Sequence, residues 1–237
     1  MKNLVILLLY FLIGPLFAES ITINWGNADP STMFDSQGNT LLSGHPTPPG
    51  TGSFLIELGT FSGEFTPDPT NYNEWHTYWR TFDRANFNED TGAFASDVQI
   101  LEDGSSDSDF RSDADSFFGQ DMWIWMYNQK EPEVLVSEWF LGRVNDWVFP
   151  DDVFGPCCGD GLPNQISLTS DWADKDPLDV TLVWGAHSSY TYEGGGFRQA
   201  DGSDFLVQTY TLIPEPGALF LVIIAFGVSI IAYSKKK

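Results

Sequence analysis

The densest group of side chains able to bind a metal ion lies in the acidic segment 102–115. Its carboxylates include two aspartate pairs with one residue between the partners: Asp107 with Asp109, and Asp113 with Asp115. Calcium takes about six to eight oxygen ligands, so paired carboxylates at this spacing could surround one ion. The EF-hand pattern is absent, because its loop glycine and its terminal bidentate glutamate are both missing. We therefore expect a solvated acidic loop, with calcium bound at these four aspartates as the alternative.

The two cysteines, Cys157 and Cys158, are adjacent in a segment rich in glycine and proline. Neighbouring Cα atoms are about 3.8 Å apart, below the usual disulfide range of about 4.4 to 6.8 Å, so a bond between these residues would be strained and comparatively easy to reduce. Two free exposed thiols are not expected to persist in an oxidising compartment. We expect a vicinal disulfide, with intermolecular bridges and metal or redox chemistry as alternatives. No further cysteine could complete a zinc site.

The sequence contains no recognisable catalytic motif. Its three histidines lack the HExxH spacing, and no serine lies in a G-x-S-x-G elbow. With 33 aspartates and glutamates, chance carboxylate pairs suited to glycoside hydrolysis are unavoidable, so their existence decides nothing. We expect a non-enzymatic protein. The alternative is a secreted carbohydrate-active enzyme that uses an acidic residue pair.

The segments that must position these residues have the pattern of short β-strands. Residues 21–25 alternate apolar and polar positions, whereas residues 122–127 are apolar on both faces, as in a central strand. Clusters of Gly, Pro, Asp and Asn with turn chemistry separate these segments from further strand patterns at 53–58, 94–100, 134–136, 139–141, 180–184 and 205–213. We expect an all-β fold, a β-sandwich or jelly roll.

One segment follows a helical period instead. Four aromatic residues are spaced by three, four and three positions, which predicts that they share one helical face: Tyr72, Trp75, Trp79 and Phe82. Asn71 with Glu74 resembles a capping box, which predicts where the helix begins. We expect one short helix packed across an open end or edge of the sandwich, with these rings in the core. A sugar-stacking platform is the alternative.

The N-terminal residues 1–18 have the pattern of a secretory signal peptide. Lys2 precedes the apolar run 4–16, and a cleavage site follows at Ala18. The alternative is an uncleaved anchor, because Leu16 is bulkier than the small residue preferred at its position. The helix-breaking pair Gly14-Pro15 favours cleavage, since it presents the following residues in extended form.

The C-terminal run 217–233 carries no charge, and a basic tail at 234–237 follows it. A helix of this length spans about 25 Å, slightly less than the hydrocarbon core of about 30 Å, and snorkelling lysines make up the difference. The run therefore predicts one transmembrane helix, with the lysines in the cytoplasm and residues 19–213 on the opposite side. A buried core helix is the alternative, although the run has no polar face.

The tripeptide Pro214-Glu215-Pro216 lies directly before this run, and its prolines keep it extended and accessible. The tripeptide, the hydrophobic span and the basic tail, in that order over residues 214–237, resemble the PEP-CTERM sorting signal. The resemblance implies recognition by an exosortase, a membrane enzyme with a cysteine-protease-like mechanism. It also implies processing near the tripeptide, which would be the substrate of that enzyme and not a catalyst. The chain would be held in the inner membrane first and then released to the cell surface or the extracellular matrix.

The body is similar, in its order of motifs, to a set of PEP-CTERM ectodomains without an established activity. This looser resemblance supports a single domain over residues 19–213 and transfers no active site. The motifs that carry it are residues 33–39, 57–61, 79–83, 118–128, 138–139 and 147–150.

The net charge of −22 excludes a nucleic-acid reader with a cationic groove. Without residues 1–18 and 214–237, 7 basic and 32 acidic residues remain, so the body carries −25. This charge favours solubility and cation uptake, and it opposes adsorption to anionic surfaces. We therefore expect an exported, exosortase-sorted protein of the cell surface or extracellular matrix, with a structural role or extracellular polysaccharide as its ligand.

Overall fold

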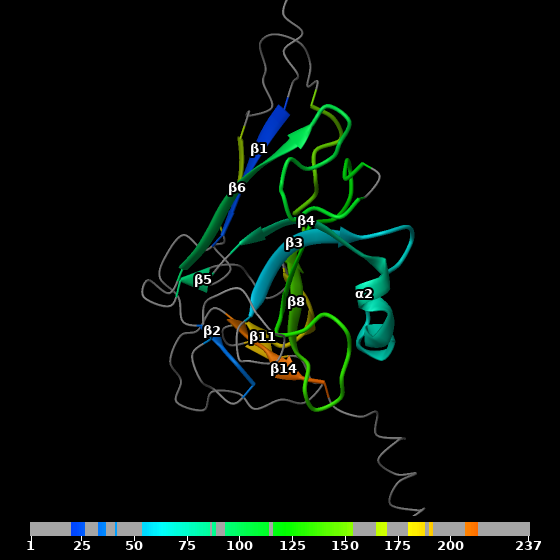
Figure 1. The fold of residues 1–237 in the computed structure, drawn as a ribbon, viewed down its shortest axis with the longest axis vertical. Helices are drawn as coiled ribbons and strands as arrows, with labels where there is room; N and C mark the ends of the chain where they lie inside the picture. Colours follow the sequence, from blue (N-terminus) through cyan, green and yellow to red (C-terminus); the bar gives the residue numbers. More distant parts are fainter. Residues whose placement is uncertain are drawn as a thin grey trace, which may run out of the picture.

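The computed structural model describes residues 20–26, 33–36, 41, 54–85, 87–88, 93–113, 116–153, 165–169, 180–187, 190–191 and 207–212. These residues form mostly β-sheet with one short helical segment (Figure 1). The predicted signal peptide, cysteine pair, Pro-Glu-Pro tripeptide, membrane span and basic tail lie outside them and remain predictions. Within the described part of the chain, no helix has the length and apolar character needed to cross a bilayer.

The largest sheet has six strands, and all its pairings are antiparallel. Its order is β10 (Val180–Trp184), β8 (Glu138–Val144), β7 (Trp123–Tyr127), β3 (Leu55–Phe61) and β4 (Trp79–Ala85), and β14 (Tyr210–Thr211) also pairs with β8. Strand β7 is buried at every position. The expectation of a central strand at 122–127 is therefore confirmed.

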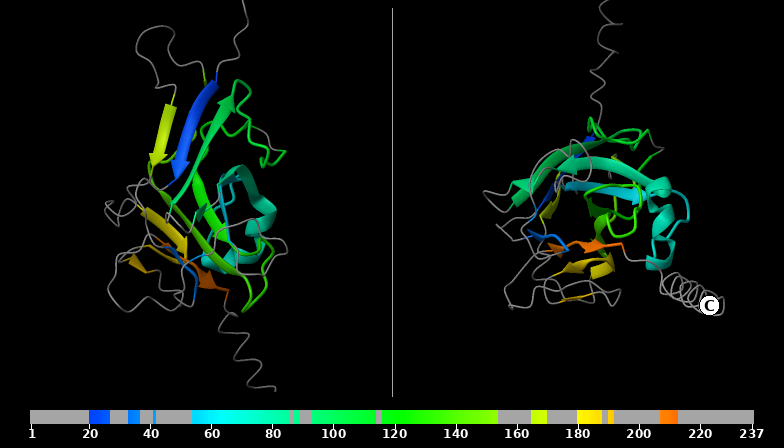
Figure 2. Two further views of the ribbon diagram at one scale, coloured as in Figure 1. Left: turned by 60° about the vertical axis from the view of Figure 1, so that its left-hand side comes forward. Right: turned by 60° about the horizontal axis from the view of Figure 1, so that its bottom comes forward.

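Two further sheets of four strands complete the described body, as Figure 2 shows from two other directions. One has the order β5 (Phe87–Asn88), β6 (Ala93–Leu101), β1 (Ser20–Gly26) and β9 (Gln165–Thr169). The other has the order β12 (Tyr190–Thr191), β11 (Ala186–His187), β13 (Val207–Gln208) and β2 (Met33–Phe34).

Two hydrophobic clusters cover the two faces of the six-stranded sheet. Along β7, Ile124 and Met126 belong to one cluster, while Trp123, Trp125 and Tyr127 belong to the other. This division follows from the alternation of side chains in a strand. The first cluster also contains residues of the β1–β6 pair, namely Ile21, Ile23, Trp25, Phe94, Val98 and Ile100. It therefore joins two sheets into one core.

The helical segment is shorter than its aromatic spacing predicts. It consists of the 3₁₀ helix η1 (Pro69–Glu74) and the single-turn helix α2 (Trp75–Tyr78), and β4 begins directly at Trp79. The prediction of one shared helical face is wrong, because Trp79 and Phe82 lie on a strand and enter opposite clusters. Pairing with β3, which places Trp79 opposite Phe61, overrides the helical period.

Three of the four aromatic side chains expected in the core, Trp75, Trp79 and Phe82, are buried, whereas Tyr72 is only partly buried. Trp75 is fully buried and stacks on Trp139 with ring centroids 5.4 Å apart. Because Trp75, Trp79 and Phe82 are all buried, these three rings offer no sugar-stacking platform.

The capping box lies earlier than Asn71 and Glu74, so that prediction is also wrong. Asp68 is the N-cap: its Oδ1 accepts a hydrogen bond from the backbone N–H of Thr70 at 2.8 Å, and its own N–H donates to Oδ1 of Asn71 at 2.9 Å. The backbone and side-chain donors of Thr70 lower the pKa of the Asp68 carboxyl. Pro69 at the first helical position fits this start, because its missing N–H needs no partner there.

The strand expected at 134–136 is absent from the structure. These residues form an exposed turn between β7 and β8. Three apolar residues in a row predict a strand only weakly. A strand forms only where a neighbouring strand is available for pairing, and so short a run does not show that one is. Here the chain reverses instead.

Candidate functional site

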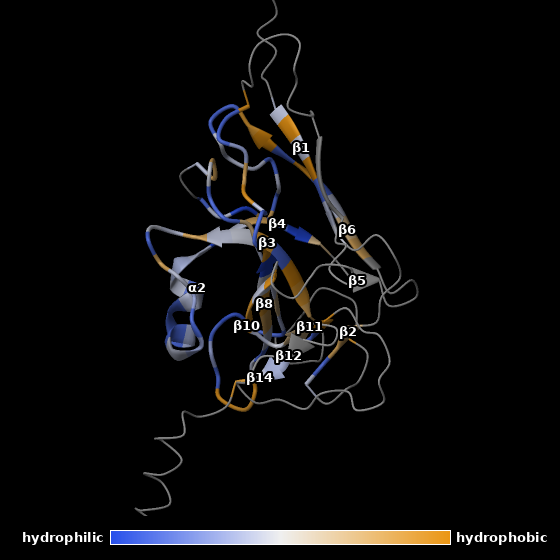
Figure 3. Cartoon of the chain, turned by 180° about the vertical axis from the view of Figure 1, so that it is seen from behind, coloured by the Kyte–Doolittle hydropathy of each residue, from blue (hydrophilic) through white to orange (hydrophobic). Residues whose placement is uncertain are grey.

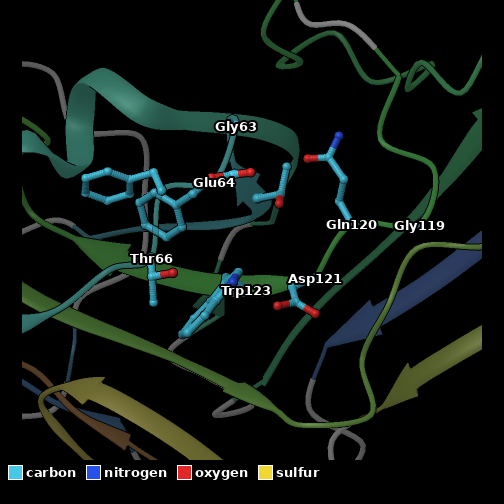
Figure 4. A pocket seen from close by; sticks show the side chains of 10 residues that line it. Gly63, Glu64, Thr66, Gly119, Gln120, Asp121 and Trp123 are labelled. Atoms are coloured by element: carbon cyan, nitrogen blue, oxygen red, sulfur yellow. The ribbon is translucent and has the colours of Figure 1, made fainter.

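An open cleft of about 700 Å³ lies where β3 ends and β7 begins (Figure 4). One wall is the loop after β3, which carries Gly63, Glu64 and Thr66. The other wall is the segment that leads into β7, with Gln120 and Asp121. The close view places Glu64 and Asp121 on different sides of the hollow, with Asp121 and Trp123 on the same segment, two positions apart.

Backbone hydrogen bonds fix the wall that leads into β7. The N–H of Gly119 donates to the carbonyl of Pro150 at 3.1 Å, and the N–H of Phe149 donates to the carbonyl of Gln120 at 2.9 Å. Gly119 has a left-handed φ of 67°, which glycine adopts without steric cost. This wall is therefore set by the backbone before any ligand arrives.

The floor of the cleft is aromatic and mostly covered. Phe61 meets Trp123 edge to face with ring centroids 6.0 Å apart, and only 6% of Trp123 is exposed. Phe65 is partly buried and stacks on Tyr78 at 4.3 Å. The cleft therefore offers a narrow apolar strip below a polar rim.

The charged groups of the cleft differ in their surroundings. Asp121 forms an ion pair with Arg143, whose guanidinium lies over the Trp123 ring at 5.2 Å from its centroid. Glu64 is exposed, and the described residues provide it with no ion pair. With the amide of Gln120, these carboxylates can exchange hydrogen bonds with a ligand rich in hydroxyl groups.

The acidic segment after β6 does not form a metal cluster in the part that the structure describes. Asp107, Asp109 and Asp113 are exposed, and Oδ1 of Asp107 accepts a hydrogen bond from the backbone N–H of Gln99 at 2.7 Å. Among the described residues, no three acidic, histidine or cysteine side chains come together as a metal site would require. Asp115 lies outside them, so calcium binding remains a prediction.

A fully buried carboxylate is the main feature that the sequence analysis missed. Glu57 in β3 has no exposed surface, and both its oxygens accept several hydrogen bonds. The donors are Tyr127 Oη (2.6 Å), Arg84 Nη2 (2.7 Å) and Nε (3.3 Å), Trp79 Nε1 (2.7 Å), Thr81 Oγ1 (2.8 Å) and Lys130 Nζ (2.8 Å). We call Glu57 and these donors the Glu57 network.

The cations of the Glu57 network keep this carboxylate ionised. Burial, the largest single influence, would raise the pKa of Glu57, and the charge and hydrogen bond of Lys130 oppose it. With the hydrogen bonds from Tyr127 and Arg84, the pKa of Glu57 lies below its usual value. Burial and the neighbouring carboxylate together raise the pKa of Tyr127 far above its usual value, so its hydroxyl remains a donor.

A second buried carboxylate, Asp83 in β4, connects distant parts of the chain. It accepts a hydrogen bond from Trp25 Nε1 at 2.7 Å and one from Ser108 Oγ at 2.6 Å. Trp25 belongs to β1, and Ser108 belongs to the acidic segment, so Asp83 holds both against the six-stranded sheet. Within the acidic segment it is therefore Ser108, and not an aspartate, that links the segment to Asp83 of β4.

A sequence signal for the Glu57 network existed. Glu57 interrupts the apolar run 54–58, and a charge inside a strand buried on both faces needs an internal partner. The partner Arg84 lies directly opposite Glu57 in the register of β3 and β4, but a register cannot be read from one strand alone.

Comparison of the chain with models of protein families, with curated proteins and with solved structures finds no match in any of the three. The structure thus defines a β-rich protein with an open, acidic cleft. Its function must be argued from that cleft.

Proposed function

We propose that the chain is an exported protein whose body binds neutral polysaccharide through the cleft beside Trp123. In this proposal the C-terminal signal at 214–237 holds the chain in the inner membrane until an exosortase-type enzyme processes it. The body then acts on the cell surface or in the extracellular matrix, without catalysis.

We also propose that the body is a β-sandwich. The support is the hydrophobic cluster that contains inward-facing residues of both the six-stranded sheet and the β1–β6 pair, such as Met126 and Val98. Two sheets that share one core are the arrangement of a sandwich. The other face of the six-stranded sheet is covered by the helical segment, through Trp75.

The composition of the cleft is the observation that carries the polysaccharide proposal. A sugar ring presents hydroxyl groups at its rim and apolar C–H groups on its faces. The polar rim of Glu64, Thr66, Gln120 and Asp121 matches the hydroxyls, and the edge of Trp123 matches a C–H face. The volume of about 700 Å³ lies within the usual range of ligand sites. The carboxylates repel polyanions, so neutral sugars are favoured.

Binding of the full chain to neutral polysaccharides tests this proposal. Calorimetry would compare the natural chain with Glu64→Gln, which keeps the size of the side chain and removes its charge. A hydrogen bond to a charged group contributes about 1.5 to 3 kcal/mol, so we expect at least about a tenfold loss of affinity. The matched control is Glu102→Gln, an exposed glutamate in the turn after β6 and outside the cleft. Equal affinities of all three proteins would contradict the proposal.

A carbohydrate-active enzyme is the second candidate, because two carboxylates, Glu64 and Asp121, line the same cleft. Glycoside hydrolysis requires such a pair on either side of the bond to be cleaved. Incubation of the protein with the same polysaccharides separates the two candidates. New reducing ends that disappear in Glu64→Gln would establish the enzyme, and binding without new reducing ends would support the first proposal.

The sorting part of the proposal has its own test. We expect mass spectrometry of the exported form to show a chain that lacks the run 217–233. Recovery of intact Lys237 outside the cell would contradict processing at the C-terminal signal.

A further inference from the structure

The turn between β7 and β8 ends in three consecutive exposed apolar residues. Val134, Leu135 and Val136 are 40%, 67% and 42% exposed, and Leu135 is the most exposed large apolar residue in the described part of the chain. We call these three residues the apolar tip. The tip interrupts the polar surface of a strongly acidic protein, so its exposure needs an explanation.

The tip is built in a fixed shape. The N–H of Ser137 donates to the carbonyl of Glu133 at 2.8 Å, and its hydroxyl donates to the carbonyl of Glu131 at 3.0 Å. The same hydroxyl accepts from the N–H of Glu133 at 2.7 Å. The buried Ser137 therefore closes the base of the turn.

The backbone at the top of the turn is in a conformation that disfavours leucine. Leu135 has φ = 65°, and it is the one residue other than glycine with a positive φ among the described residues. Glycine or asparagine usually occupies such a position, because a Cβ atom there is crowded by the backbone. Leu135 is thus both strained and exposed, and it gains nothing from the core. We conclude that this side chain acts outside the body.

The tip lies where the chain leaves the body toward its C-terminus. The N–H of Leu135 donates to the carbonyl of Leu212 at 2.8 Å, and the N–H of Leu212 donates to the carbonyl of Ser137 at 2.8 Å. Figure 3 shows the hydrophobic end of this turn beside β14. Four residues lie between Leu212 and the start of the apolar run 217–233, so an extended chain covers the five steps in at most about 18 Å.

We propose that the apolar tip inserts into the interfacial layer of the membrane that holds the C-terminal run. This inference rests on the membrane anchoring in the proposed function, and it adds a second contact that fixes the orientation of the body. The tip is hydrogen-bonded to Leu212, and at most about 18 Å of chain joins Leu212 to the span. The tip is therefore close enough to the membrane for its three apolar side chains to enter the interfacial layer and leave water. The flanking Glu131 and Glu133 are exposed, so the favoured surface is zwitterionic and not anionic.

Photocrosslinking of the full chain tests the proposal. The chain would be reconstituted in phosphatidylcholine vesicles with p-benzoylphenylalanine in place of Leu135, and lipid adducts would be identified by mass spectrometry. The matched control carries the same group in place of Phe110, which is 40% exposed in the acidic segment after β6. Figure 1 places the end of β6 away from β14. We expect at least about tenfold more lipid adduct at position 135, since an apolar side chain favours the interface by about 1.5 kcal/mol or more.

Each other outcome overturns the proposal in a distinct way. Equal lipid adducts at both positions would show no preference of the tip for the membrane. Crosslinks from position 135 to a second copy, or to residues 217–233, would identify a protein occupant instead of lipid. If an alkaline carbonate wash releases the chain from the vesicles, the anchoring itself fails. If the chain stays embedded and position 135 gives no lipid adduct, only the tip proposal fails.

Discussion

Replacement of Glu57 by glutamine should destabilise the protein strongly. The change keeps the shape of the side chain, removes its charge, and turns one acceptor oxygen into a donor that faces other donors. In the natural protein Arg84 and Lys130 form ion pairs with Glu57 at 2.7 and 2.8 Å. In the variant both cations lose this counter-charge. The variant therefore leaves two cations without a counter-charge beside a buried amide.

The size of the effect follows from burial. Removal of one partner from a buried ion pair costs about 3 to 5 kcal/mol. The side chains of Arg84 and Lys130 are 23% and 27% exposed, so water relieves part of the cost and about 3 kcal/mol is expected. Total stabilities of domains are about 5 to 15 kcal/mol, so this loss is a large fraction.

Urea denaturation of the full chain in a mild non-ionic detergent, followed by tryptophan fluorescence, measures the loss. With a slope of about 2 kcal/mol/M, the midpoint should fall by about 1 to 2 M without a change in slope. The control Glu102→Gln removes an exposed carboxylate and should stay within about 0.5 kcal/mol of the natural protein. A loss below about 1 kcal/mol for Glu57→Gln would refute the reasoning, because it would mean that the Glu57 network is not tightly coupled to folding.

The same network makes stability depend on pH. The folded-state pKa of Glu57 is lowered from its ordinary 4.5, so its contribution is fully present above about pH 4.5. The contribution is lost as the pH falls through the lower folded-state pKa, because protonation then removes the charge that Lys130 and Arg84 face. Glu57→Gln should therefore show a weaker loss of stability between neutral and acidic pH. An identical acid dependence would contradict this assignment.

Three further predictions concern other parts of the chain. In Gly59→Ala the new Cβ would lie 2.3 Å from the Arg80 carbonyl and 2.7 Å from the Trp79 ring, so a lower urea midpoint and a loss of about 1 to 3 kcal/mol are expected. Leu135→Asn should raise stability by roughly 1 kcal/mol, because asparagine tolerates the positive φ; an unchanged midpoint would count against strain there. If the aspartates of the acidic segment bind calcium, the melting temperature should be higher in millimolar calcium than with chelator, and equal values would end that suggestion.

Much of the β-structure could be predicted from the sequence. The residues of β1 and β10 follow from alternation and turn chemistry, and β7 follows from an apolar run with no polar face. These signals are local, because the period of side chains along a strand is fixed by the backbone. The helical segment was predicted to be longer than it is, since the aromatic spacing fits a helix up to Phe82 whereas β-pairing takes over at Trp79.

The cleft and the Glu57 network could not be predicted in the same way. The cleft unites residues after β3 with residues before β7, and 54 positions separate Thr66 from Gln120. The turn at 134–136 has strand composition, and only the reversal of the chain at Leu135 shows that it is a tip. For the cleft and the Glu57 network, the deciding contacts join segments that are far apart in the sequence.

The acidic charge, the β-rich class and the apolar run at 217–233 can be read directly from the amino-acid sequence, because each depends on composition or on a short repeating pattern. Which carboxylates are buried and which face solvent depends instead on the three-dimensional fold. Glu57 and Glu64 are the same residue type seven positions apart, yet one is enclosed by cations and the other lines an open cleft. The physical reason is that desolvation and pairing depend on neighbours, and the register of β3, β4 and β7 brings those neighbours together.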